Sequence, residues 1–224
     1  MRHVIVFAEG QTEERFIKEL VAPSLYHINI YVLPQLLNTS KSSKGGAVSF
    51  DRLKFNARNT LRSRQDVILS TFLDLYALET DFPGFEAAKL KADVYDRVET
   101  LEQALRDEIV DYVGCRQERF VPHIQPYEFE GLLFSDVSKL VEVEVGWAAK
   151  INNLEGIRND VPNPEHINDG YETKPSKRLE NLLTPRYRKT THGPRAAQKI
   201  SLTVIENECP HFKNWMDSLR QLAN

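Results

Sequence analysis

Several acidic side chains of this 224-residue chain follow apolar stretches, at the points where those stretches end. Carboxylate oxygens are the ligands that Mg²⁺ and Mn²⁺ prefer, and two such ions can activate water and stabilise the leaving oxygen in phosphodiester cleavage. Without a cation, carboxylates brought together would repel one another. We therefore predict a divalent-metal site that takes Mg²⁺ or Mn²⁺. The candidate ligands are Glu9, Asp74, Glu128, Glu130 and Asp81.

The pattern leaves the choice between Glu128 and Glu130 open. In an extended chain, residues two apart point to the same side, whereas in a helix their directions diverge strongly. The sequence changes from a strand pattern to a helical pattern at this point. We favour Glu128, which is nearer to the strand end, over Glu130. A single acid at a strand end is as often structural as functional, so the prediction depends on the acids occurring together.

The elements that would position these acids alternate along the chain. Short apolar stretches at 2–8, 28–37, 67–73 and 119–126 predict strands, and segments between and after them have helical periodicity, as at 50–64 and 86–114. This alternation predicts an α/β fold with a mostly parallel four-stranded sheet and flanking helices. The carboxyl ends of parallel strands meet at one edge of a sheet, where such folds place their sites.

The last third of the chain has a different composition. Residues 147–195 contain many turn-forming residues, and the segment from Lys174 to Lys199 has eight basic residues and one acid, Glu180. We predict a core over 1–144 and, over 145–224, a basic extension of irregular and helical structure packed on it. Mixed cationic and hydroxyl side chains are typical of phosphate contacts. The predicted nucleic-acid-binding residues are Lys174, Ser176, Lys177, Arg178, Tyr187, Lys189 and His192.

Composition narrows the class of protein. Hydrophobic residues make up 41% and charged residues 27% of the chain, as in ordinary globular proteins, and the net charge of −3 gives no overall basic field. No apolar run is long enough for a membrane span, so we expect no membrane partner. The two cysteines, Cys115 and Cys209, do not form a disulfide framework, and a cytoplasmic location is expected. The sequence is compatible with an oligomer.

Six segments resemble a bacterial Toprim-like family of unknown function, related to the Toprim domain of OLD-type (overcoming lysogenisation defect) nucleases. They are AEGQTEERF (8–16), TFLDLYALETDFPG (71–84), PYEFEGLLFSD (126–136), INDGYETKPSKRL (167–179), YRKTTHG (187–193) and CPHFKNW (209–215). The resemblance spans nearly the whole chain and implies a Toprim-like, Rossmann-like fold. It also implies metal binding by Glu9 and Asp74, and a further acid and base that we place on Glu128 and Lys189. The predicted catalytic residues are therefore Glu9, Asp74, Glu128 and Lys189.

The resemblance implies a metal-dependent nuclease that acts on nucleic acid with a partner ATPase encoded nearby, in bacterial defence. One position departs from the Toprim pattern, because Tyr76 stands where these domains have the second aspartate of Asp-x-Asp. An alternative is therefore a degenerate, non-catalytic module that binds a partner ATPase or nucleic acid. A third possibility is phosphoryl or nucleotidyl transfer to a small molecule.

Overall fold

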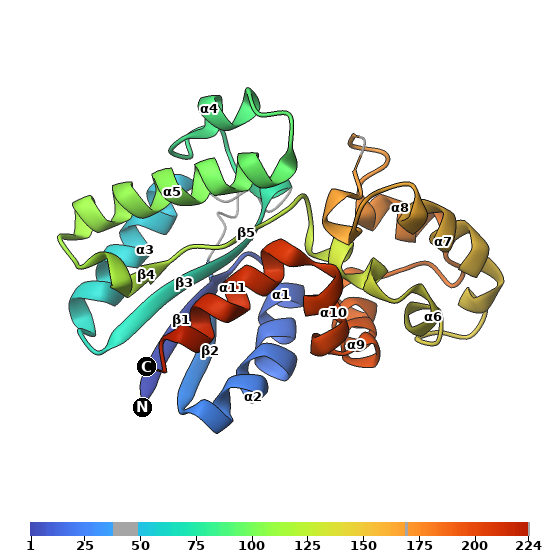
Figure 1. Ribbon diagram of the computed structural model, residues 1–224, viewed down its shortest axis with the longest axis horizontal. Coiled ribbons are helices and arrows are strands. Elements are labelled where there is room, and N and C mark those ends of the chain that lie inside the picture. Colours follow the sequence, from blue (N-terminus) through green and yellow to red (C-terminus); the bar gives the residue numbers. More distant parts are fainter. Residues whose placement is uncertain (38–48, 169, 224) are drawn as a thin grey trace.

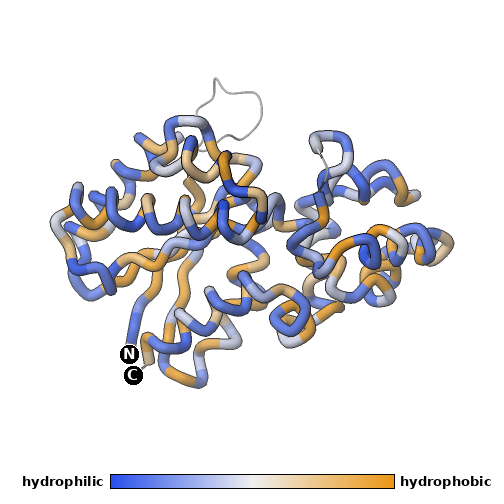
Figure 2. Tube along the Cα trace, turned by 45° about the horizontal axis from the view of Figure 1, so that its top comes forward, coloured by the Kyte–Doolittle hydropathy of each residue, from blue (hydrophilic) through white to orange (hydrophobic). Residues whose placement is uncertain are grey.

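The computed structural model describes residues 1–37, 49–168 and 170–223. They form a mixed α/β fold, in which helices flank a parallel sheet in a Rossmann-like arrangement (Figure 1). The predicted fold class, α/β with a parallel sheet and flanking helices, is confirmed. Figure 2 shows hydrophobic residues concentrated along the strands and a mixture of hydrophobic and hydrophilic residues along the helices.

The sheet has the strand order β2-β1-β3-β4, with β5 also paired to β3, and all its pairs are parallel. The strands are β1 (Arg2–Ala8), β2 (Ile30–Leu36), β3 (Val67–Asp74), β4 (Phe120–Val121) and β5 (Ile124–Gln125). The fourth predicted strand, over 119–126, is split into β4 and β5. Pro122 lies between them and supplies no backbone N–H for a ladder hydrogen bond. Since β1 and β3 are the inner strands, residues that follow them have neighbours on both sides.

One face of the sheet is covered by α3 (Phe50–Ser63) and α5 (Val94–Val113), with the short α4 (Phe85–Lys89) beside them. Leu53 and Leu61 of α3 pack in one apolar cluster with Phe7 of β1. The single helix predicted over 86–114 is two helices. They are separate because the Asp93 side chain accepts the N–H of Tyr95 and so caps the start of α5.

The other face is covered by helices from both ends of the chain. They are α1 (Gln11–Phe16), a π-helical turn (Ile17–Val21), α2 (Ala22–Leu25) and α11 (Pro210–Gln221). Phe16 of α1 and two rings of α11, Phe212 and Trp215, surround Phe72 of β3 with centroid distances of 5.3–6.3 Å. The indole N–H of Trp215 also donates to Ser70 Oγ at 2.9 Å. The last helix is therefore an integral part of the sheet's cover.

A second group of helices lies beside the sheet, at the right of Figure 1. It contains α6 (Val137–Leu140), α7 (Ile151–Asn159), α8 (Pro175–Leu182), α9 (Lys189–Ile200) and α10 (Leu202–Glu208). Short 3₁₀ helices complete the fold at Tyr26–Ile28, Leu75–Ala77, Gln117–Arg119, Phe129–Ser135, Trp147–Lys150 and Pro164–His166.

The last third is more regular than its turn-forming residues suggested, because α7, α8 and the start of α9 are helical. Pro175 and Pro210 lie in the first turns of α8 and α11, where a missing N–H removes no helical hydrogen bond. Buried residues from both parts, such as Val4 and Trp147, share one apolar cluster. The division between residues 144 and 145 stays a prediction. Within the described ranges, no helix is both long enough and apolar enough to cross a bilayer.

Candidate metal centre

Three carboxylates meet at the carboxyl end of β3. Asp74, Glu128 and Glu130 each place one oxygen within 4.8 Å of the others, and all three side chains are buried. Asp74 is the last residue of β3 and pairs in register with Gln125 of β5, so the chain leaves the sheet directly beside it. The N–H of Phe129 then donates to Asp74 Oδ1 at 2.8 Å. This bond holds the Glu128–Glu130 segment against the strand end.

Both glutamates of the segment reach the cluster, which resolves the choice that the sequence left open. The backbone of Glu128 is extended, with φ −145° and ψ 152°, and the 3₁₀ helix Phe129–Ser135 starts immediately after it. Glu128 accepts hydrogen bonds from Lys174 Nζ at 2.8 Å and from the Ser176 N–H at 3.0 Å. Glu130 accepts one from the buried Tyr187 hydroxyl at 3.3 Å. Each carboxylate is thus oriented by its own partners.

Glu9 follows β1 and interacts electrostatically with the same cluster. Its Oε2 atom is buried and has no hydrogen-bond partner among the described residues. A buried carboxylate oxygen without a partner is costly, because it has lost its water and gained nothing in exchange. Such an atom is a natural position for a cation to bind.

Glu13 is a further acid of the site and is not among the predicted ligands. It lies in α1 and is buried, and its charge raises the pKa of both Glu9 and Asp74. The turn at Gly10 brings it close, since a Cβ there would lie 2.9 Å from Glu13 Oε2. The four-residue spacing from Glu9, with a glycine between them, is the signal that could have identified Glu13.

Lys189 supplies the central positive charge. It is the first residue of α9, and its Nζ lies 3.0 Å from Glu130 Oε2 and 3.4 Å from Glu128 Oε1. Burial opposes its charge, but Glu130, Glu128 and Asp74 hold the pKa of Lys189 above its ordinary value. The side chain is still 37% exposed, so the ammonium group connects the buried acids to the surface.

The pKa values show that, for most of these acids, burial and mutual repulsion have a larger effect than the positive charge of the nearby lysines. Burial, with repulsion from Glu13, raises the pKa of Glu9 to about 8. Burial likewise raises the pKa of Glu130 to about 7, despite Lys189, and places the pKa of Asp74 well above its usual range. Glu128 differs: burial opposes ionisation, but Lys189, Lys174 and Ser176 together lower its pKa. A divalent cation would supply the charge that the other acids lack.

The residues present fit a hard divalent cation. All the candidate donors are carboxylate oxygens, which suit Mg²⁺ or Mn²⁺. They come from three parts of the chain, which are the end of β3, the turn after β1 and the segment at the start of the 3₁₀ helix Phe129–Ser135. Asp74, Glu128 and Glu130 therefore lie together, and Glu9 interacts electrostatically with Asp74 and Glu130. Their role as metal ligands stays a prediction.

The structure does not bring Asp81 to the cluster. Asp81 is exposed, and its Oδ2 accepts the N–H of Phe50 at 3.1 Å. Phe50 is the first residue of α3, whose unpaired N–H groups favour an anion. Asp81 therefore lies outside the group of three acids and stabilises a helix start.

The basic stretch divides between the site, the core and other surfaces. Lys174 and Lys189 contact the acids, and Lys177 pairs with Glu180 at 3.5 Å. Arg178 donates to the carbonyl of Thr173 instead of facing the acids. The stretch therefore supplies two lysines to the site.

Three residues predicted to contact nucleic acid are buried and fit structural roles instead. The Ser176 N–H binds Glu128, and the Tyr187 hydroxyl binds Glu130, so both orient carboxylates. His192 accepts the Arg188 N–H at 2.9 Å and packs edge-on to the Trp147 ring. The signal against a surface role was the helical spacing of the inward residues of α9, which are His192, Gly193, Ala196, Ala197 and Ile200.

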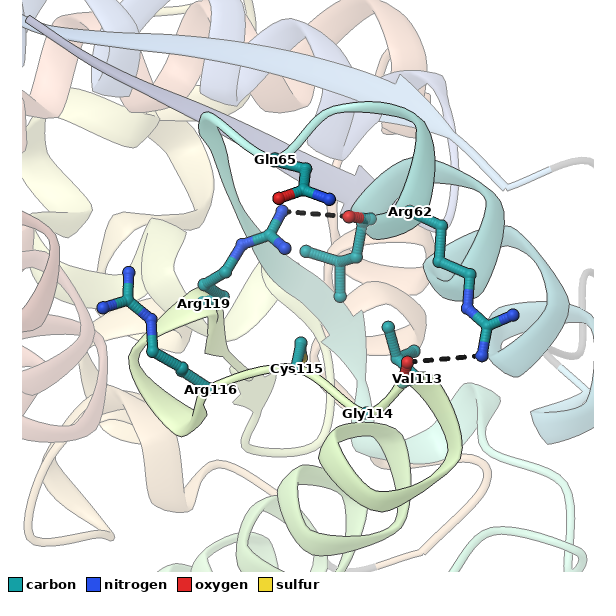
Figure 3. A pocket seen from close by; sticks show the side chains of 8 residues that line it. Arg62, Gln65, Val113, Gly114, Cys115, Arg116 and Arg119 are labelled. Atoms are coloured by element: carbon teal, nitrogen blue, oxygen red, sulfur yellow. Dashed lines mark hydrogen bonds between the residues drawn. The ribbon is translucent and has the colours of Figure 1, made fainter.

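A cavity of about 630 Å³ lies elsewhere, at the amino end of the sheet, where arginines surround it (Figure 3). Arg62 donates to the Val113 carbonyl at 3.4 Å, and Arg119 donates to the Leu61 carbonyl at 3.1 Å. These carbonyls lie at the ends of α3 and α5, where the helices leave them unpaired. Arg62 and Arg119 therefore have structural partners, and the acids remain the best candidate site.

Comparison with known proteins gives one family match. The model of the family described as "Domain of unknown function (DUF4276)" matches residues 8–220. The matched range includes every candidate residue from Glu9 to Lys189. Neither the curated proteins nor the solved structures yielded a match.

Proposed function

The chain belongs to the DUF4276 family, and we propose that it is a divalent-metal-dependent nuclease that cleaves phosphodiester bonds in nucleic acid. The observation that carries the proposal is the convergence of the buried carboxylates of Asp74, Glu128 and Glu130, with Glu9, whose buried Oε2 has no partner among the described residues, in electrostatic contact with them. The sequence resemblance to Toprim domains supports the same function. It also motivates the wider proposal of a cytoplasmic partner of an ATPase in bacterial defence.

When bound, Mg²⁺ or Mn²⁺ would polarise the phosphate and activate water. Glu9 and Asp74 would hold the ion, and Glu128 and Glu130 would complete its surroundings. Lys189 reaches from these acids toward the surface, so its ammonium group can bind a phosphate oxygen of the substrate. Lys174 can bind a neighbouring phosphate, because it is part-buried and fixed by Glu128.

Glu13 bears on the absent second aspartate of the Toprim pattern. Tyr76 occupies that position, yet the buried Glu13 places another carboxylate among the same groups. We propose that Glu13 compensates for Tyr76, so that the site keeps enough negative charge for a divalent ion. The competing function is a non-catalytic module that binds a partner ATPase or nucleic acid. The observation that favours it is that Tyr76 stands in place of the second aspartate of the Toprim pattern.

The test combines cleavage with metal binding. Purified protein is incubated with plasmid, linear duplex, single-stranded DNA and RNA in Mg²⁺ or Mn²⁺, with and without any ATPase found to be encoded beside it. We expect cleavage that Glu9→Gln lowers at least about 100-fold, because a metal ligand is lost. Glu86→Gln is the matched control, since the Glu86 side chain is 80% exposed.

Manganese binding, followed by electron paramagnetic resonance, should weaken in Glu9→Gln and not in Glu86→Gln. If no substrate is cleaved under any condition and Mn²⁺ binding is the same in both variants, the nuclease proposal is wrong. Nucleic-acid binding that persists in Glu9→Gln without any cleavage would favour the non-catalytic module.

A further inference from the structure

A small apolar cavity lies directly beside the candidate metal centre. Its volume is about 180 Å³, and its walls include Leu75, Phe85 and Leu101 together with Tyr76 and Tyr127. Two of these residues are sequence neighbours of the acids, because Leu75 follows Asp74 and Tyr127 precedes Glu128. The cavity and the acids are therefore positioned by the same two chain segments.

Two tyrosine rings lie together at this cavity. The ring centroids of Tyr76 and Tyr127 are 5.7 Å apart at an interplanar angle of 36°. The N–H of Tyr76 donates to the carbonyl of Tyr127 at 3.1 Å, which ties the two segments together. Tyr127 has a φ of 56°, an unusual conformation for a residue with a large side chain, and such strain persists only where surrounding structure enforces it. The Tyr76 ring remains 41% exposed.

A lysine connects these rings to the acids. Lys174 Nζ lies 5.6 Å from the centre of the Tyr76 ring and 5.2 Å from the centre of the exposed Tyr171 ring. The same ammonium group donates to Glu128 at 2.8 Å. Arg97 and Lys89 also line the cavity. An aromatic, apolar pocket with cations at its margin and a metal site beside it matches the chemistry of one nucleotide, with its base inside and its phosphates outside.

We propose that this cavity receives one unstacked nucleobase of a single-stranded or locally unpaired nucleic acid, next to the phosphate held at the metal centre. The proposal rests on the proposed nuclease function and adds the substrate class to it. A base in a duplex is stacked and paired, so it cannot enter without first leaving the helix. Stacking on tyrosine tolerates any base, because every base has an aromatic face.

A base-binding role would explain why a tyrosine stands at position 76 where Toprim domains have an aspartate. The side chain that departs from the Toprim metal pattern is an exposed ring at the margin of the cavity. In this arrangement Tyr76 binds substrate, and the acids of the site are supplied by other elements of the fold.

The test measures binding apart from cleavage, with Ca²⁺ in place of Mg²⁺. The probes are a 12-nucleotide single strand containing one 2-aminopurine, a hairpin duplex of the same sequence, and AMP. We expect Tyr76→Ala to weaken single-strand binding about tenfold, the lower part of the range for one stacked base, and to leave duplex binding unchanged. In wild type, stacking on Tyr76 should quench the fluorescence of the bound 2-aminopurine. Tyr76→Phe, which keeps the ring, should restore both single-strand binding and this quenching.

Tyr26→Ala is the matched control, because Tyr26 is 48% exposed and lies on the other side of the sheet from this cavity. Equal single-strand binding by wild type and Tyr76→Ala, or equal losses on single strand and duplex, would overturn the proposal. Tighter binding of AMP than of the oligonucleotide would overturn nucleic acid as the occupant. If cleavage depends on Glu9 but Tyr76→Ala does not weaken single-strand binding selectively, only the nucleobase pocket is rejected. If Tyr76→Ala weakens single-strand binding selectively but no substrate is cleaved, only the nuclease function is rejected.

Discussion

Replacing Glu9 by glutamine should stabilise the metal-free protein at high pH, although it removes a proposed metal ligand. Glu9 is held at a pKa of about 8 in the folded chain, against an ordinary value of 4.5. Because the folded pKa is raised, its contribution to stability is complete below pH 4.5 and is lost as the pH rises through 8. The difference corresponds to about 5 kcal/mol, an upper value because Glu9 titrates together with its acidic neighbours.

Glutamine has nearly the same shape and cannot ionise, so Glu9→Gln removes this pH-dependent loss. We expect its stability relative to wild type to improve by about 3–5 kcal/mol between pH 5 and pH 9. The comparison between two pH values cancels the constant cost of burying the new amide. Urea unfolding in EDTA, followed by the fluorescence of the buried Trp147 and Trp215, measures it. Glu86→Gln, exposed to solvent, should show no such trend.

Manganese should reduce the advantage of Glu9→Gln at high pH. An ion at 100 times its dissociation constant stabilises the folded state by about 2.7 kcal/mol, and Glu9→Gln should gain much less than wild type. A relative stability of Glu9→Gln that is the same at pH 5 and pH 9 would refute the reasoning. That result would mean that the Glu9 carboxylate is hydrated in solution and not a buried, repelled group.

Two further substitutions test other parts of the site. Lys189→Met leaves Glu128 and Glu130 without their shared cation, so urea unfolding at pH 8 should show a loss of about 1–3 kcal/mol, since the lysine side chain is 37% exposed; an unchanged stability would contradict an ion-pair network at these residues. Gly193→Ala places a methyl group 2.9 Å from Thr12 Cγ2 and 3.0 Å from the Tyr187 hydroxyl. The resulting overpacking should cost about 1–3 kcal/mol in a thermal melt, and a variant as stable as wild type would show that α9 can move away from α1.

The fold and part of the site follow from local patterns in the sequence. Short β-branched runs located β1 and β3, and the rule that parallel strands end at one edge brought Glu9, Asp74 and Glu128 together. Glu130 could not be decided, because the chain changes from extended to 3₁₀ helical between it and Glu128. That change depends on a long-range bond from Phe129 to Asp74, which no local pattern contains.

The errors have a common physical origin, because residue type alone does not say which way a side chain faces. Tyr187 and His192 were assigned to a surface because they lie among arginines and lysines, but α9 turns them into the core. Asp81 was assigned to the metal because it is acidic, but the start of α3 attracts it. Glu13 was not predicted as a site residue, because acids are common in the first turn of a helix and need no functional explanation there.

The position of α11 has a consequence for biosynthesis. Phe212 and Trp215 complete the cover of Phe72 that Phe16 of α1 begins, so one face of β3 is fully covered only by residues made long after it. At ordinary elongation rates, about 7–30 s pass between the synthesis of β3 and that of α11. During that interval β3 keeps only the part of this cover that α1 supplies. The aromatic cluster around Phe72 is therefore completed only after α11 has been made.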